Sequence, residues 1–226
     1  MAEKELIKLS IDERVAVLTL DIMPDNRMDK HFFRTLHGVF NMVNNNKNIG
    51  AMIINSCGRH FSAGADVEDV KGTVLNPYYD GCKMDEILER SILKDTRLFR
   101  SIEMMDIPVI AAITGFCLGS GFELAMACNI RICSSDSFFG CPELSFGIIT
   151  GMSGSIRLKE MVGKTKTAEM LLVGDLIAAN EAYRLGLVNK VLKRNEVLSY
   201  ALELARSYSA EERYIVNCEI KRKVFF

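Results

Sequence analysis

The sequence has no tryptophan, only three histidines and four prolines, and almost no excess of either charge. Its 28 Lys and Arg residues against 29 Asp and Glu residues leave a net charge of −1, which argues against a protein that coats nucleic acid or a membrane surface. Hydrophobic residues make up 49% of the chain, too many for a disordered protein. No run reaches the roughly 18 apolar residues of a membrane span, and the charged segment 1–10 does not resemble a signal peptide. We therefore expect a globular, cytoplasmic protein that binds neither nucleic acid nor membrane.

Disulfide and metal chemistry also lack support. The seven cysteines are an odd number without a CxxC pair, and most lie in apolar runs where cysteine behaves as a small hydrophobic residue. No HExxH motif is present, and we place His31 and His37 on a helix face rather than on a metal. The sequence thus predicts reduced, buried thiols and no metal site.

Predicted strands alternate with predicted helices along the chain, which indicates an α/β fold. Runs of buried, β-branched residues predict strands at 14–20, 51–54, 109–113, 130–133, 138–139 and 187–192. Helical spacing of apolar residues predicts helices at 28–46, 84–105, 122–127, 153–162, 165–173, 178–185 and 196–207. The 226 residues suffice for one sizeable core. We expect a core domain over residues 1–207 and a C-terminal helical segment over residues 208–226.

Two tight turns rich in small residues follow predicted buried strands. The first, residues 61–66, follows the strand 51–54; the second, residues 119–121, precedes a helix whose first amides lack intrahelical partners. Such a helix end attracts an anion, either a phosphate or a developing oxyanion. The phosphate motifs fit poorly, because the Lys of GxxxxGK[ST] and the third Gly of GxGxxG are missing. One amide from each turn would form an oxyanion hole, although glycines needed only for tight packing are the alternative.

Two glutamates flank the second turn. Glu123 falls in the first turn of the helix that follows Gly121, and Glu143 follows Pro142 at the predicted start of another helix. Apolar surroundings and mutual repulsion would raise the pKa of at least one carboxyl toward the range of a general acid. Alternatively, each glutamate only complements a helix dipole.

These segments resemble the crotonase (enoyl-CoA hydratase/isomerase) family. The resemblance spans residues 14–224, and its motifs are the segments at 60–66, 108–115, 118–125, 139–147, 151–158 and 172–191. It implies a β-β-α spiral followed by C-terminal helices, and binding of acyl thioesters. Members of the family usually continue for several helices beyond the region of Lys221, so we expect a shortened C-terminal helical region and less cover over the nucleotide end of CoA.

The resemblance also implies roles for individual residues. Backbone N–H groups of Ala65 and Ser120 would form the oxyanion hole and stabilise a thioester enolate. Glu123 would orient and deprotonate a water, Glu143 would protonate the α-carbon, and Arg157 would be a scaffold residue. The expected substrate-binding residues are Ala63, Gly64, Asp66, Gly119 and Gly151, of which Gly151 would hold the water through its backbone and Asp66 would act mainly as scaffold.

We therefore expect a hydratase or dehydratase of 2-enoyl (3-hydroxyacyl) thioesters. Two alternatives stay open: a same-fold isomerase or decarboxylase in which Glu143 acts alone, and a non-catalytic acyl-thioester binding subunit. A serine hydrolase acting through Ser120 is disfavoured, because GxSxG is absent and no histidine follows that serine.

The substrate carrier and the pathway are less defined. The expected partner is an acyl-CoA or an acyl-carrier-protein thioester, so that coenzyme A or phosphopantetheine enters as part of the substrate and no tightly bound cofactor is needed. Fatty acid metabolism and polyketide biosynthesis both fit. The resemblance implies a homotrimer or a hexamer, and places the acyl pocket among residues 67–105, where no pattern identifies the acyl group.

Overall fold

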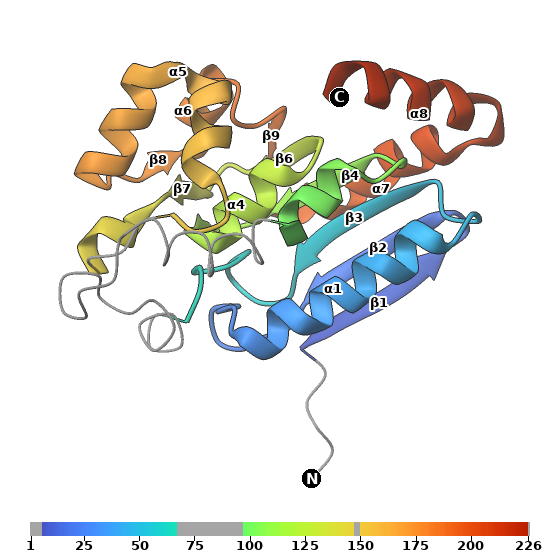
Figure 1. Cartoon of the computed structure of the whole chain (residues 1–226), viewed down its shortest axis with the longest axis horizontal. Coiled ribbons are helices and arrows are strands. Elements are labelled where there is room, and N and C mark those ends of the chain that lie inside the picture. The colour runs from blue at the N-terminus through green and yellow to red at the C-terminus, as the bar shows by residue number, and fades with distance from the viewer. Residues whose placement is uncertain (1–5, 67–96, 147–149, 226) are drawn as a thin grey trace, which may run out of the picture.

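The computed structural model describes residues 6–66, 97–146 and 150–225, and its centre is a six-stranded sheet (Figure 1). The strand order is β1-β2-β3-β4-β6-β9; β1 is antiparallel to β2 and every later neighbour is parallel. The strands of this sheet are β1 (Ile7–Asp12), β2 (Val15–Leu20), β3 (Ala51–Ser56), β4 (Val109–Ile113), β6 (Ile130–Ser134) and β9 (Lys190–Leu192). The parallel order brings the ends of β3 and β4 to the same edge.

A small second sheet and the helices surround the main sheet. The second sheet pairs β7 (Phe138–Gly140) with β5 (Phe116–Leu118) and β8 (Ile177–Ala178). The helices are α1 (Lys30–Asn45), α4 (Ser120–Ala127), α5 (Gly154–Val173), α6 (Ala179–Arg184), α7 (Val197–Ser209) and α8 (Glu211–Phe225), with 3-10 helices η1 (Pro142–Phe146) and η2 (Arg194–Glu196). None of the helices in the described ranges is both long and apolar enough to cross a membrane.

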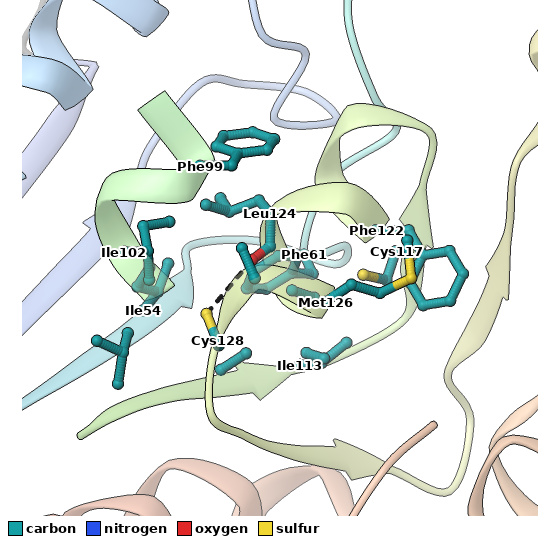
Figure 2. Close-up of a cluster of buried hydrophobic side chains, with 14 of the residues drawn as sticks. Ile54, Phe61, Phe99, Ile102, Ile113, Cys117, Phe122, Leu124, Met126 and Cys128 are labelled. Atoms are coloured by element: carbon teal, nitrogen blue, oxygen red, sulfur yellow. Dashed lines mark hydrogen bonds between the residues drawn. The ribbon is translucent and has the colours of Figure 1, made fainter. Parts of the chain in front are cut away.

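Side chains on opposite faces of the main sheet enter two separate cores. Met52 and Ile54 of β3 join the larger core with α1 and α4, whereas Ile53 joins the smaller core under α7. Figure 2 shows part of the larger core, where Ile54 lies with Leu124 of α4 and with side chains of the helical segment 97–103. Because successive strand residues point to opposite faces, continuous apolar strands are required to fill both cores.

The larger core surrounds α4 almost completely. Residues 121–127 are all buried, including Glu123. By contrast, α1 is amphipathic and buries only one face, through Phe32, Leu36, Phe40 and Val43. Burial of residues 121–127 fixes the first turn of α4 inside the protein, whereas Ser120, the first residue of the helix, is half-buried.

The predicted α/β architecture is confirmed, with local differences. The strands β1, β5 and β8 were not predicted: β5 and β8 are only three and two residues long, whereas β1 alternates the apolar Ile7, Leu9 and Ile11 with polar residues, a strand pattern that the prediction missed. The two predicted helices at 153–162 and 165–173 are confirmed as the halves of α5, which Gly163 interrupts with φ of 77° and ψ of 168°. Most of the predicted helix 84–105 lies outside the described residues; 97–103 is helical. The division at residue 207 stays a prediction.

Burial of most of the described cysteines and the positions of His31 and His37 on a helix agree with the prediction. The six cysteines in the described ranges are free, and all except the half-buried Cys57 are buried. His31 and His37 are exposed on α1. Within the same ranges, no cluster of three or more His, Cys, Asp or Glu side chains could hold a metal ion.

Candidate active site

The two predicted turns are joined by backbone hydrogen bonds. The Ser62 amide donates to the Phe116 carbonyl (3.0 Å), and the Leu118 amide donates to the Ser62 carbonyl (3.0 Å). The turn 61–66 therefore pairs with β5, the strand that leads into α4. The approach is close: a Cβ atom added to Gly64, whose φ is +96°, would lie 3.1 Å from the Leu118 carbonyl oxygen and 3.5 Å from the Gly119 Cα. Only glycine fits at this contact.

The pairing leaves the amides of Ala65 and Ser120 available. Residue 28 bonds to both neighbours of Ala65, since its amide donates to the Gly64 carbonyl and its carbonyl accepts from the Asp66 amide (2.9 Å each). In such a parallel bridge the amide of the middle residue, Ala65, points away from Met28. No backbone carbonyl among the described residues accepts a hydrogen bond from this amide. Ser120 is the first residue of α4, so its amide has no intrahelical acceptor.

Ser62 and Asn26 support the first turn from within the protein. The Ser62 hydroxyl donates to the Asn26 carbonyl (2.7 Å) and accepts from the Gly64 amide (3.0 Å). The Asn26 side chain accepts from the Ile22 amide (2.7 Å) and donates to the carbonyls of Cys57 (3.0 Å) and His60 (2.9 Å). Both side chains are buried, so the shape of the turn depends on polar groups that the sequence motifs do not reveal.

Glu123 is buried, with 1% of its surface exposed. Its Oε1 atom accepts from the amides of Met152 (2.9 Å) and Gly154 (2.8 Å), at the start of α5. Its Oε2 atom has no hydrogen-bond partner among the described residues. Burial, and then the nearby charge of Glu143, raise the pKa of Glu123 to about 7, although the two amides and Arg157 favour the ionised form. This carboxyl can accept or donate a proton near neutral pH.

Glu143 lies against the second turn. A Cβ atom added to Gly119 would lie 3.1 Å from Oε1 of Glu143, which places this carboxylate beside the residue before Ser120. The Oε2 atom of Glu143 is buried without a hydrogen-bond partner among the described residues, and burial raises the pKa of the carboxyl. The predicted helix at this position is a 3-10 helix of five residues, η1, rather than an α-helix. Glu143 and Glu123 thus present one unpaired oxygen each.

The other predicted residues fall around this centre. Ala63 and Asp66 are half-buried in the first turn, where their amides donate to the carbonyls of residues 25 and 28. Gly151 is half-buried beside the segment that binds Glu123, and no atom of the described residues lies within 4 Å of a Cβ atom added to it. Arg157 is buried and interacts with Glu103. The predicted acyl pocket at 67–105 lies mostly outside the described residues.

Comparison with known proteins places the chain among enzymes of thioester chemistry. A family model described as enoyl-CoA hydratase/isomerase matches residues 10–219. A probable enoyl-CoA hydratase of Bacillus subtilis (strain 168) is 37% identical over 204 residues, which are 90% of this chain and 76% of the relative. A short-chain-enoyl-CoA hydratase of Clostridium acetobutylicum is 34% identical over 200 residues, 87% of this chain and 72% of that protein. The crystal structure of an enoyl-CoA hydratase from Bacillus anthracis superposes with a TM-score of 0.84 at 25% identity, covering 97% of this chain and 82% of that one.

Proposed function

Since this chain belongs to the enoyl-CoA hydratase/isomerase, or crotonase, family and has the crotonase fold, we propose that it is a hydratase that adds water across the 2,3-double bond of an enoyl thioester. In this proposal the oxyanion hole is formed by the amides of Ala65 and Ser120, and the proton transfers are carried out by Glu123 and Glu143. The reverse reaction, loss of water from a 3-hydroxyacyl thioester, uses the same groups.

The observation that carries the proposal is a pair of carboxyls, on the buried Glu123 and the half-buried Glu143, each with a buried Oε2 atom. Each glutamate leaves an Oε2 atom without a partner among the described residues, and an unsatisfied buried polar atom is costly unless a ligand or water completes it. Hydration needs a base that takes a proton from water and an acid that supplies a proton to carbon. Two carboxyls with raised pKa values, beside two available amides, supply these groups.

The proposed reaction is balanced in one turnover. The thioester carbonyl oxygen accepts hydrogen bonds from the amides of Ala65 and Ser120. Glu123 takes a proton from water as the water oxygen bonds to C3, and the π electrons of the double bond move toward the thioester to form an enolate. Glu143 then gives its proton to C2. One proton has entered the pair on Glu123 and one has left it from Glu143, so the pair keeps one proton, which must return from Glu123 to Glu143, directly or through water, before the next turnover.

The shared proton predicts the pH dependence of turnover. Repulsion between Glu123 and Glu143 disfavours the doubly ionised pair, so one carboxyl holds a proton while the other is ionised, and the apparent pKa values belong to the pair. The activity should fall at low pH, where both carboxyls are protonated, and at high pH, where neither is. A bell-shaped profile of kcat against pH is the expected signature.

Hydration of a crotonyl thioester by the wild type, Glu123→Gln and Glu143→Gln tests the proposal. We expect turnover by the wild type and a loss of roughly 10²–10⁴-fold in each variant, because each loses a general acid–base group. Glu203→Gln, an exposed change on α7, serves as the matched control and should retain wild-type turnover. Near-normal turnover in Glu123→Gln would contradict hydration by the pair and support isomerisation or decarboxylation by Glu143 alone. Binding without turnover would instead support a non-catalytic role.

The same assay identifies the thioester carrier. The crotonyl group is offered on CoA and on an acyl carrier protein in parallel, followed by longer and branched enoyl groups. Preference for the CoA form would agree with the relatives named as enoyl-CoA hydratases, whereas preference for the carrier-protein form would point to a synthetic pathway that keeps its intermediates on a phosphopantetheine arm.

A further inference from the structure

A buried cation lies next to the segment that holds Glu123. The Arg157 side chain projects from the first turn of α5, and only 6% of the residue surface is exposed. Its Nε atom lies 2.5 Å from Oε1 of Glu103, which belongs to the helical segment 97–103. Its Nη1 atom donates to the Met152 carbonyl. Arginine is almost never buried without such partners, so the position of this side chain is tightly determined.

The carbonyl that binds Arg157 belongs to a residue that also binds Glu123. The Met152 carbonyl accepts from Arg157, and the Met152 amide donates to Oε1 of Glu123 (2.9 Å). Ser153, which follows, has a left-handed backbone with φ of 64°, a conformation that a non-glycine residue adopts only where its surroundings enforce it. The Gly154 amide then makes the second hydrogen bond to Glu123 (2.8 Å). The turn 152–154 therefore links Arg157 to Glu123: its Met152 carbonyl accepts from Arg157, and its Met152 and Gly154 amides donate to Glu123.

We propose that Arg157, itself held by Glu103, is a positioning residue for hydration: it fixes the turn 152–154 that binds Glu123 and keeps this carboxylate ready to take a proton from water. The inference rests on the proposed function, in which Glu123 acts on the water. The sequence predicts only a scaffold role for Arg157. The proposal adds that the ion pair of Arg157 and Glu103 affects turnover.

The charges around Glu123 support this role. Glu143 of η1 raises the pKa of Glu123, and Arg157 of α5 lowers it; the buried Cys141 beside the two glutamates is a neutral thiol, because burial raises its pKa. Together with the amides of Met152 and Gly154, Arg157 thus opposes the effects of burial and of Glu143 on the pKa of Glu123. Without it, the pKa of Glu123 would rise above about 7, and the fraction of ionised base at neutral pH would fall.

Glu103 completes the arrangement. Its second oxygen, Oε2, lies 3.3 Å from Nη1 of Arg100, so the carboxylate is oriented from both sides. A buried guanidinium that loses its partner carboxylate is left uncompensated, which destabilises its position. We therefore expect Glu103→Gln to change the same properties as a substitution of Arg157, but less strongly, since the amide oxygen still accepts a hydrogen bond.

The test measures kcat, KM and the pH profile of four variants with a crotonyl thioester. Arg157→Met removes the charge and both hydrogen bonds, Arg157→Lys restores the charge, and Glu103→Gln weakens the pair. Arg206→Met, in an exposed ion pair with Asp12, is the matched control. We expect Arg157→Met to lose about 10²-fold in kcat, the order expected for a misplaced catalytic group, with little change in KM. The acidic limb of its profile should move to higher pH, and Arg157→Lys should return it toward the wild type.

A second measurement does not depend on turnover. The carboxyl band of Glu123 is assigned in the infrared spectrum by subtraction of the Glu123→Gln spectrum, and its titration is followed in the wild type and in each variant. The proposal requires the midpoint to rise in Arg157→Met and to stay unchanged in Arg206→Met. An unchanged midpoint and acidic limb in a folded Arg157→Met would overturn it. If Arg157→Met does not fold, the test relies on Arg157→Lys and Glu103→Gln. An unchanged Glu123 midpoint in Glu103→Gln, together with wild-type kcat in Arg157→Lys and in Glu103→Gln, would also overturn the proposal.

The two measurements separate the inference from the proposed function. A wild type that binds thioesters without hydrating them would contradict the hydratase, yet the infrared midpoint would still test whether Arg157 controls Glu123. If the wild type hydrates the thioester but the infrared midpoint of Glu123 does not change when Arg157 is substituted, the hydratase proposal stands and the positioning role is overturned.

Discussion

Gly154 lies in direct contact with the carboxyl group of Glu123. A Cβ atom at this position would be 2.5 Å from Oε1 and 2.9 Å from Cδ of Glu123. These distances are shorter than real Cβ contacts, so a larger residue would displace either the carboxylate or the start of α5. Because the Gly154 amide binds the same Oε1 atom, the displacement would also break one of the two hydrogen bonds that orient the carboxylate.

Gly154→Ala should therefore reduce kcat by about 10²-fold, the order expected for a misplaced catalytic group, and lower the free energy of unfolding by about 1–3 kcal/mol through overpacking. Steady-state kinetics and urea denaturation measure the two effects. Gly38→Ala is the control: Gly38 is exposed in α1, and no atom in the described part of the chain lies within 4 Å of the added Cβ, so alanine should stabilise the helix by about 0.5–1 kcal/mol. Wild-type kcat in Gly154→Ala would contradict the contact.

Among individual residues, the sequence indicates the glutamates of the candidate site better than the groups that orient them. Glu123 and Glu143 stand out because each carboxylate occurs in an apolar segment next to a glycine-rich turn. The groups that orient them do not stand out, because Met152 and Gly154 act through backbone amides that any residue type carries. Ser62 supports its turn with a hydroxyl bonded to distant backbone, and no local pattern predicts a contact across 36 residues.

Helix α4 is held at both ends by elements that are distant in sequence. At its N-terminus lie the turn 61–66 and Glu143. At its C-terminus the buried Arg131 of β6 donates to the Cys128 carbonyl and, at 3.4 Å, to the Ala125 carbonyl, while its Nε atom donates to the Leu187 carbonyl (2.7 Å). A cation suits this end of a helix, because the last carbonyls carry partial negative charge.

Arg131→Met should destabilise the protein by about 3 kcal/mol, because methionine fills similar space but leaves buried carbonyls without a donor. Chemical denaturation followed by circular dichroism measures the change. Arg184→Met, which removes an exposed pair with Glu181 on α6, should stay within about 0.5 kcal/mol of the wild type. A small loss in Arg131→Met would show that water replaces the guanidinium at the end of α4.

Among the strands, the longer apolar runs were the easiest to predict, although length alone does not decide, because the three-residue β7 and β9 were predicted and the six-residue β1 was not. The strands β2, β3, β4 and β6 are each five or six residues of mostly apolar sequence, and all four were predicted. The three-residue β5 was not, although it carries the pairing with the turn 61–66 that brings the two available amides together. Such a strand has too few residues for a periodic pattern and forms because its surroundings supply partners.

For the molecule as a whole, the buried carboxyl of Glu123 makes the free energy of unfolding depend on pH. An unfolded chain ionises Glu123 near its usual pKa of 4.5, whereas the folded protein holds the proton to about pH 7. Since the folded state binds this proton more tightly, the contribution of Glu123 to stability is present at low pH and is lost as the pH rises from about 4.5 to about 7. The full loss is about 3 kcal/mol.

Glu123→Gln removes this titration, since the amide carries no proton that is lost in this range. Relative to the wild type, the variant should therefore be more stable at about pH 8 than at about pH 5, by roughly 3 kcal/mol. Urea denaturation at the two pH values measures the difference, and Glu203→Gln, an exposed change on α7, should show none. A difference of the opposite sign would mean that the folded protein stabilises the ionised carboxylate.

The break at Gly163 has a mechanical consequence for this site. The first half of α5 carries Arg157 and the Gly154 amide, one of the two amides that hold Glu123, whereas the second half ends in the exposed Leu172 and Val173. A helix resists bending because its hydrogen-bond ladder is continuous. At Gly163 the backbone leaves helical geometry, and no atom of the described residues lies within 4 Å of where a Cβ would be. The two halves of α5 are therefore not one rigid helix. Displacement of its exposed C-terminal end need not be transmitted to the turn that holds Glu123.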